Sequence, residues 1–303
     1  MLDLAGVKAF PVMLNPSPHE RIDTDLPSLG QFSHMITAIP KSNGTYTWLD
    51  ATSNTCSFGD LPDVNQGRKG FLIGDETGTF IDIPLFPAED NRLILKTEMQ
   101  LDEQRSVNGE IFMGTKGQYN RDSRLRYQQF APDDWKDALA AELSHQFPGI
   151  QVDWVESSSL ENLDAPVEIR AGFRVDHYAQ SIDDQLLLPL PIDEFGDYAE
   201  LFARTNRKYT LNLGYPMQVT KEVSIELPDG WTAVLPGDLT MESDFATVDR
   251  QFNRDRNLVR YKLDFALHRS VIPPAEYSAA KRFFDALARE DKSHLILERI
   301  QGS

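Results

Sequence analysis

The chain has 303 residues, 41% of them hydrophobic, so it is long enough for roughly two or three domains with buried cores. Its 47 acidic and 30 basic residues give a net charge of −17, which disfavours binding to nucleic acid or to anionic membranes. The single cysteine excludes an internal disulfide, and no apolar run is long enough for a membrane-spanning helix.

Two strands are predicted at 30–39 and 45–50, with a turn between them. Both alternate polar and apolar residues and are rich in β-branched and aromatic side chains. They carry His34 and Asp50, residue types that can form a general base and the carboxylate that orients it. Without further context such a pair more often has a structural role, so both interpretations are kept.

The register of this hairpin decides whether the two side chains meet, since a shift of one residue reverses the faces of a strand. A five-residue loop at 40–44 pairs His34 with Asp50 and leaves their Cβ atoms about 4.5–5.5 Å apart. A two-residue type I′ turn at the Asn-Gly pair places Thr37 opposite Asp50 and turns His34 away. The sequence leaves both registers open.

The other candidate site residues are expected to be ordinary. Cys56 follows Asp50 in a polar loop, where a loop thiol without special reactivity is expected. His19 lies in a long loop, 15–29, with no second ligand or base near it, so a solvated loop histidine is expected. No spacing matches a zinc or calcium site, and no Gly-rich phosphate loop is present, so the sequence predicts no metal and no cofactor.

Antiparallel strands and two amphipathic helices are predicted after residue 92. Strands are expected at 93–101, 107–115, 125–130, 150–155 and 167–178, followed by an apolar stretch at 186–192. The final β segment runs through 207–213, 218–227, 241–250 and 258–268. The first helix is expected at 132–148, with a buried face of Trp135, Leu139, Leu143 and Phe147. The second follows Pro273-Pro274, and its buried face is Tyr277, Ala280, Phe284 and Leu287.

These elements predict an α+β fold that is predominantly antiparallel β. Three domains are expected, and the helices divide between the second and the third. Their bounds are 1–90, 91–192 and 193–303, with one helix in the second and a closing helix in the third. The second and third domains are expected to be similar to β-sandwiches.

The run from Met1 to Ile73 resembles the later part of the transglutaminase-like core of bacterial multidomain proteins, a papain-like cysteine-enzyme fold. Four blocks in order carry this resemblance: LAGVKAFPV (4–12), PSLGQFSH (27–34), WLDAT (48–52), and FGDLP with QGR (58–68). The resemblance implies that 1–90 is the C-terminal part of such a core, and that His34 and Asp50 occupy its catalytic histidine and aspartate positions. The strand ending in the Pro-Asp-Gly turn before Trp231 resembles the β domain of unknown function that follows such cores.

In this family the nucleophilic cysteine lies on a helix before the Ala-Gly-Val segment. This chain is expected to start too late to contain it, since Met1 to Leu4 looks like the end of that helix. The resemblance therefore implies the truncated, C-terminal part of an enzyme for acyl transfer or for amide or peptide hydrolysis, inactive as this chain. It implies a polypeptide substrate or the missing N-terminal part of the core as partner. A homo-oligomer is a further candidate, because the absent helix would leave apolar surface exposed.

The chain is expected to be soluble, because no apolar run is long enough to span a membrane, and its N-terminus does not have the pattern of a secretory signal. A periplasmic or extracytoplasmic location is expected for the parent protein, since relatives are often exported. Two other functions stay open: a non-enzymatic scaffold whose β domains engage a polypeptide or an envelope component, and a metal-dependent hydrolase, which lacks a ligand motif. The enzyme hypothesis predicts a hydrogen bond between His34 and Asp50.

Overall fold

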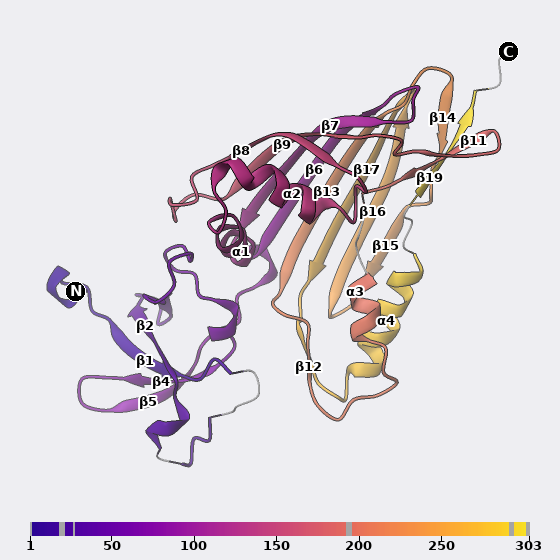
Figure 1. Ribbon diagram of the computed structural model, residues 1–303. Helices are drawn as coiled ribbons and strands as arrows, with labels where there is room; N and C mark the ends of the chain where they lie inside the picture. The colour runs from indigo at the N-terminus through magenta and orange to yellow at the C-terminus, as the bar shows by residue number, and fades with distance from the viewer. Residues whose placement is uncertain (1, 18–21, 27, 192–195, 291–293, 301–303) are drawn as a thin grey trace.

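A five-stranded antiparallel sheet forms the N-terminal part of the chain, in the order β3-β2-β1-β4-β5 (Figure 1). The computed structural model describes residues 2–17, 22–26, 28–191, 196–290 and 294–300. The strands of this sheet are β1 (Phe10–Leu14), β2 (His34–Pro40), β3 (Tyr46–Leu49), β4 (Lys69–Ile73) and β5 (Gly78–Asp82). Ile36 and Ala38 of β2 and Trp48 of β3 are buried in one small core. The hairpin therefore has the alternating burial that its sequence predicts.

The register of the β2–β3 hairpin is neither of the two left open. Thr37 pairs with Leu49, and the Lys41 N–H donates to the Thr45 carbonyl at 2.8 Å. The turn therefore spans residues 42–44, and its last residue is a glycine with φ +81°. Three-residue hairpin loops commonly end on such a glycine, because a left-handed residue there restores the strand pairing. Both predicted loop lengths are wrong.

This register still brings the site residues together. Continued by one residue, it sets Asp50 opposite Ile36. His34 lies two positions before Ile36, and residues two apart on a strand share a face. The two site residues are thus diagonal neighbours on one face, rather than the directly opposed pair that the five-residue loop predicted.

Eight strands form the second sheet, in the order β15-β16-β17-β13-β6-β7-β9-β8. Its pairs are antiparallel except β6 with β13, which is parallel. The strands are β6 (Arg92–Leu101), β7 (Val107–Lys116), β8 (Gln151–Ser157), β9 (Glu168–Val175), β13 (Met217–Glu226), β15 (Leu239–Glu242), β16 (Ala246–Asp255) and β17 (Leu258–Leu267). The segments 91–192 and 193–303 both contribute strands to this sheet, so residue 192 marks no break in it.

Two smaller sheets and two helices pack on the side of the large sheet formed by β16 and β17. The sheets are β10-β11-β19-β14 and β12-β18, built from β10 (Gln180–Ile182), β11 (Gln185–Pro189), β12 (Leu211–Asn212), β14 (Trp231–Val234), β18 (Val271–Ile272) and β19 (His294–Arg299). Helices α3 (Gly196–Leu201) and α4 (Tyr277–Arg289) lie side by side there (Figure 1). The predicted face of α4 is confirmed, because its residues Tyr277, Ala280, Phe284 and Leu287 are all buried. The last residue of the apolar stretch at 186–192 lies outside the described residues.

Helices α1 (Gln118–Tyr127) and α2 (Trp135–Leu143) cover the other end, over β7, β8 and β9. The strand predicted at 125–130 is wrong, because this segment ends α1. Apolar periodicity does not reveal α1, since the helix buries polar side chains. Arg124 is fully buried and donates to the carbonyl oxygens of Asn162 and Ala165 at 2.7 and 2.6 Å.

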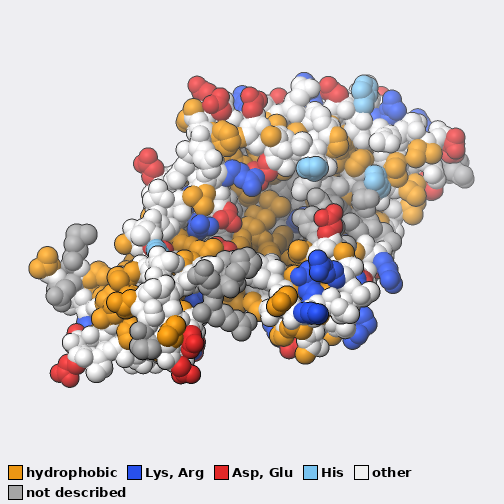
Figure 2. All heavy atoms as spheres, turned by 60° about the horizontal axis from the view of Figure 1, so that its bottom comes forward, with side chains coloured by type: hydrophobic (Ala, Val, Ile, Leu, Met, Phe, Trp, Pro, Cys, Tyr) orange, Lys and Arg blue, Asp and Glu red, His pale blue; other side chains and the backbone are white. Residues whose placement is uncertain are grey.

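A hollow separates these two helical covers on the face of the large sheet. Its volume is about 330 Å³, and it is lined mainly by apolar side chains such as Leu93 and Leu95 of β6, Met217 and Val219 of β13, and Leu143 of α2. Figure 2 shows hydrophobic side chains gathered in a depression of the molecule. No helix among the described residues is long and apolar enough to cross a membrane.

The predicted fold class is confirmed: the chain is α+β and mostly antiparallel β. The described residues contain four α-helices rather than the two expected. The additional helices are α1 and α3, and neither has the long apolar stripe by which α2 and α4 were predicted.

Candidate functional site

His34 and Asp50 form a hydrogen-bonded pair at the edge of the five-stranded sheet. The Nε2 atom of His34 lies 2.9 Å from Oδ2 of Asp50, so the hydrogen bond expected between them is present. His34 is the first residue of β2, and Asp50 directly follows β3. The Asp50 side chain is 3% exposed and that of His34 is 21% exposed, so a buried carboxylate supports an imidazole that reaches solvent.

Other hydrogen bonds also converge on the Asp50 carboxylate. Thr52 donates to Oδ1 twice, from its backbone N–H at 3.0 Å and from its hydroxyl at 2.7 Å, and Asn65 donates to Oδ2 at 2.7 Å. Burial by itself raises the pKa of Asp50, but the hydrogen bonds from Thr52 and His34 outweigh burial and lower that pKa below its usual value. Asp50 is therefore ionised near neutral pH.

The ionised Asp50 determines which nitrogen of His34 carries the proton. A carboxylate only accepts hydrogen bonds, so the proton in this contact belongs to Nε2. In the neutral ring the lone pair then lies on Nδ1, to which no described residue makes a hydrogen bond. Such an imidazole can take a proton through Nδ1, and the adjacent carboxylate stabilises the cation that results.

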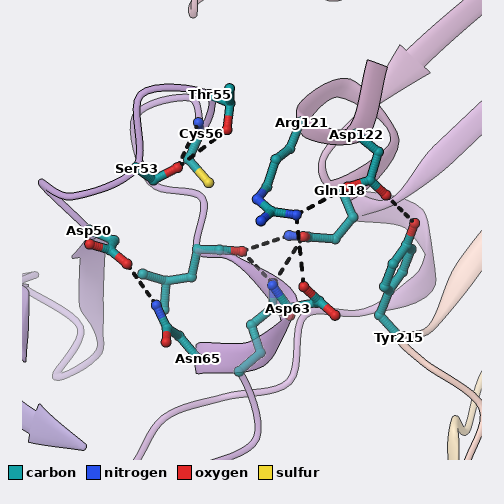
Figure 3. A network of polar contacts seen from close by, with 12 residues as sticks. Asp50, Ser53, Thr55, Cys56, Asp63, Asn65, Gln118, Arg121, Asp122 and Tyr215 are labelled. Atoms are coloured by element: carbon teal, nitrogen blue, oxygen red, sulfur yellow. Dashed lines mark hydrogen bonds and ion pairs between the residues drawn. The ribbon is translucent and has the colours of Figure 1, made fainter. Parts of the chain in front are cut away.

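A network of polar contacts connects Asp50 to helix α1 (Figure 3). Asn65 is the last residue of a 3₁₀ helix, Asp63–Asn65, in the turn that follows Leu61. The Gln118 side chain binds both ends of the 61–63 segment: Nε2 donates to the Leu61 carbonyl at 2.6 Å, and Oε1 accepts from the Asp63 N–H at 3.0 Å. The first residue of α1 therefore holds the turn that carries Asn65.

Sequence reasoning missed Asn65 and Gln118. Neither belongs to a motif, and their contacts span 15 residues to Asp50 and 55 residues to Asp63. A hydrogen bond between segments so far apart leaves no periodic pattern in one sequence. The only signal is that both residues are polar and uncharged at buried positions, and their burial is known only from the structure.

Cys56 has no part in the His34–Asp50 pair. Its backbone N–H donates to the Ser53 hydroxyl, and the thiol makes no hydrogen bond to His34. Burial raises the pKa of the Cys56 thiol, which disfavours the nucleophilic thiolate. His19 lies outside the described residues. Among the described residues, no group of three or more His, Cys, Asp or Glu side chains is placed to hold a metal ion.

Comparisons with known proteins give a partial family match and a fold. Residues 184–297 match the model of a family described as a domain of unknown function with a solved structure, DUF3858. This segment overlaps the region, 193–303, in which the sequence resembles a β domain of unknown function. No curated protein matches the chain.

A solved structure that is similar in fold covers nearly the whole chain. It is a protein from Parabacteroides distasonis named as a putative protease, with 14% identity and a TM-score of 0.53 over 98% of this chain. The chain spans 41% of the length of that protein. A second structure, baculovirus P35, has 8% identity over 70% of this chain and 97% of its own, and its TM-score of 0.14 carries no argument.

Proposed function

We propose that His34 and Asp50 are the general base and its orienting carboxylate in a transglutaminase-like cysteine enzyme. The reaction class is acyl transfer from an amide, or hydrolysis of an amide or peptide bond. The nucleophilic thiol comes from polypeptide outside this sequence, and this chain alone is inactive. We also propose that the parent protein is located in the periplasm or elsewhere outside the cytoplasm.

The observation that carries the proposal is the geometry of the pair. A buried, ionised Asp50 accepts from Nε2 of His34, and Nδ1 is left without a partner among the described residues. This is the arrangement by which a histidine deprotonates a nucleophile. Similarity in fold to a protein named as a putative protease supports the same class, as does the resemblance to transglutaminase-like cores.

The proposed chemistry follows from this arrangement. Nδ1 of His34 takes the proton of the thiol, and the thiolate attacks the carbonyl carbon of the amide. The C–N bond then breaks, the leaving amine takes the proton from Nδ1, and a thioester remains. A second amine or a water molecule then attacks the thioester carbon while Nδ1 takes a proton from it. The C–S bond breaks, and the proton passes from Nδ1 to the sulfur, which regenerates the thiol. Asp50 stays ionised throughout and stabilises the imidazolium.

The first test is the intact mass and N-terminal sequence of the protein isolated from the cells that make it. The proposal expects a longer polypeptide with a cysteine upstream of the Ala-Gly-Val segment at residues 5–7. A mature product that starts at Met1 would leave the pair without a thiol other than Cys56 and would sink the proposal.

The second test is activity of that longer polypeptide on a glutamine-containing peptide, read as incorporation of a primary amine and as release of ammonia. The substitution His34→Ala should lower the rate by about 100-fold or more, since general-base catalysis contributes that much. The matched control is His268→Ala, because His268 also has a side-chain hydrogen bond, to Thr247, but directly follows β17 of the large sheet. Equal activity of both variants would exclude His34 as the base.

A second function, binding of a polypeptide by the β structure, is favoured by one observation. The hollow between α2 and α3 exposes apolar side chains of β6 and β13, and its size is in the range of ligand pockets. The substitution Val219→Trp would fill this hollow from its floor. If binding is the function, Val219→Trp should abolish binding of the polypeptide, and His34→Ala should leave that binding unchanged.

A further inference from the structure

We propose that Asn65 is a positioning residue for the His34–Asp50 pair, and that Gln118 of α1 acts through it by holding the turn on which Asn65 lies. The inference rests on the proposed function only in calling the pair catalytic. The positioning itself is a property of this chain and can be measured without a thiol or a substrate.

The contact between Asn65 and Asp50 has a defined direction. Because the ionised carboxylate only accepts, the amide nitrogen of Asn65 must face it, at 2.7 Å from Oδ2. The residue is 1% exposed, and its amide oxygen has no hydrogen-bond partner among the described residues. A buried amide oxygen without a partner destabilises a fold, so an apolar side chain would serve packing better. The donor to Asp50 is the contact that accounts for an asparagine here.

The two oxygens of Asp50 are held from different directions. Both donors to Oδ1 belong to Thr52, two residues away on the same turn. The oxygen that meets His34 is Oδ2, and its other donor, Asn65, comes from the separate turn after Leu61. Thr52 therefore anchors one oxygen as a pivot, and Asn65 fixes where the other oxygen lies. The position of the hydrogen-bond acceptor for His34 Nε2 depends on Asn65.

Gln118 makes this position depend on the C-terminal part of the chain. The residue is 1% exposed, and its side chain makes hydrogen bonds to the Leu61 carbonyl and the Asp63 N–H (Figure 3). Its own N–H donates to Oδ1 of Asn91, whose Nδ2 donates to the Pro216 carbonyl at 2.9 Å. An unbroken series of polar contacts thus runs from Pro216 to the turn that ends in Asn65. A segment inside the DUF3858 match is by this route part of the support of His34.

The test is the tautomer of His34, read from the ¹⁵N chemical shifts of its imidazole in the ¹⁵N-histidine-labelled chain at a pH where the ring is neutral. The unsubstituted chain should have His34 protonated on Nε2. Asn65→Leu keeps the shape and removes the donor, so both tautomers should become populated. Thr55→Val is the matched control, because Thr55 is equally buried in the neighbouring loop and does not contact Asp50. Its spectrum should keep the Nε2–H form.

Unchanged imidazole shifts in Asn65→Leu would overturn the proposal. If that variant does not fold, Asn65→Ala, which only removes atoms, is measured in its place. Failure of the proposed function gives a different result: the longer polypeptide would be inactive, while Asn65→Leu would still change the tautomer of His34.

The second arm tests the path through Gln118. Gln118→Ala should cause part of the change seen in Asn65→Leu, and the double variant should change no more than Asn65→Leu alone, because a residue that acts through another adds nothing once that other is gone. Additive changes would show that Gln118 affects His34 by a separate route and would overturn its assigned role.

Discussion

His34 and Asn65 meet at one oxygen of Asp50, with Nε2 of the histidine at 2.9 Å and Nδ2 of the asparagine at 2.7 Å from Oδ2. Two further bonds from Thr52 hold the other oxygen. These contacts keep an ionised carboxylate at 3% side-chain exposure. Burying a charge is unfavourable unless it is fully hydrogen-bonded, so the stability of this part of the chain should depend on the charge of Asp50.

Asp50→Asn should destabilise the chain in a pH-dependent way. The folded-state pKa of Asp50 lies below its unfolded value, because hydrogen bonds from Thr52 and His34 outweigh the effect of burial. The ionised form therefore stabilises the fold above about pH 4, and this contribution is lost as the pH falls through the folded pKa. We expect Asp50→Asn to lower the free energy of unfolding by about 1–3 kcal/mol at pH 7, with a smaller difference at pH 3.

Urea unfolding of both proteins at the two pH values measures this difference. The control is Asp75→Asn, since the Asp75 side chain is 77% exposed in its ion pair with Lys8. An exposed pair contributes little, so this control should change stability by less than about 0.5 kcal/mol. An Asp50→Asn variant as stable as the parent at pH 7 would contradict the account of the site.

Cys56 should react slowly with a thiol reagent in the folded chain at neutral pH. Burial raises the pKa of this thiol, which reduces the fraction of thiolate, and thiolate is the reactive form. The measurement is the rate of modification by a chromogenic disulfide at pH 7, in buffer and in denaturant. We expect unfolding to raise the rate of modification by about tenfold or more. A fast reaction in the folded chain would reopen Cys56 as a nucleophile.

The sequence predicts those elements whose signal is local. Alternation with period 2 identified β6, and an apolar stripe with period 3.6 identified α4. Helix α1 carries neither signal, because Arg124 and Gln118 are buried against backbone carbonyls that the sequence does not display. A helix whose buried face is polar is therefore missed by reasoning from hydrophobic pattern.

The site residues also divide into those that the sequence predicts and those that it does not. His34 and Asp50 were found because their chemistry and the resemblance point to them, although the hairpin register was not predicted. That register depends on Gly44 adopting a positive φ, and an Asn-Gly pair is compatible with turns of several lengths. Asn65 and Gln118 matter only through contacts between distant segments, and such contacts follow from the tertiary structure.

Gly117→Ala should be strongly destabilising, because two costs coincide at this residue. Gly117 precedes α1 with φ +64°, and a Cβ atom there would lie 2.1 Å from the Asp90 carbonyl oxygen. Its φ of +64° with ψ −127° is a conformation that alanine rarely adopts and that costs about 1–3 kcal/mol, and the backbone clash adds to that. Gly149→Ala is the matched control, because Gly149 has φ +79° with nothing within 4 Å of its Cβ position.

Thermal and urea unfolding of the two variants measures the difference. The control should lose only the conformational cost of about 1–2 kcal/mol. A greater loss in Gly117→Ala would reflect the displaced contact with Asp90. Equal losses would show that the junction between β7 and α1 can relax around a methyl group, which would weaken the case for Gln118 as a rigid support.

Asp60→Asn should stabilise the chain at neutral pH, which is the opposite of the effect expected for Asp50→Asn. Burial, and then repulsion from Asp90, raise the pKa of Asp60, and no described residue donates a hydrogen bond to its carboxylate. Its ionised form therefore destabilises the fold above about pH 4, and this cost disappears at lower pH as the group protonates. Removing the charge should raise the free energy of unfolding at pH 7 by about 0.5–2 kcal/mol and change it little at pH 3.

Urea unfolding of Asp60→Asn and Asp50→Asn at the two pH values measures both effects. The same chemical change is made at two carboxylates ten residues apart, so the sign of the stability change can be compared directly. Destabilisation by Asp60→Asn at pH 7 would mean that the Asp60 carboxylate has a stabilising partner.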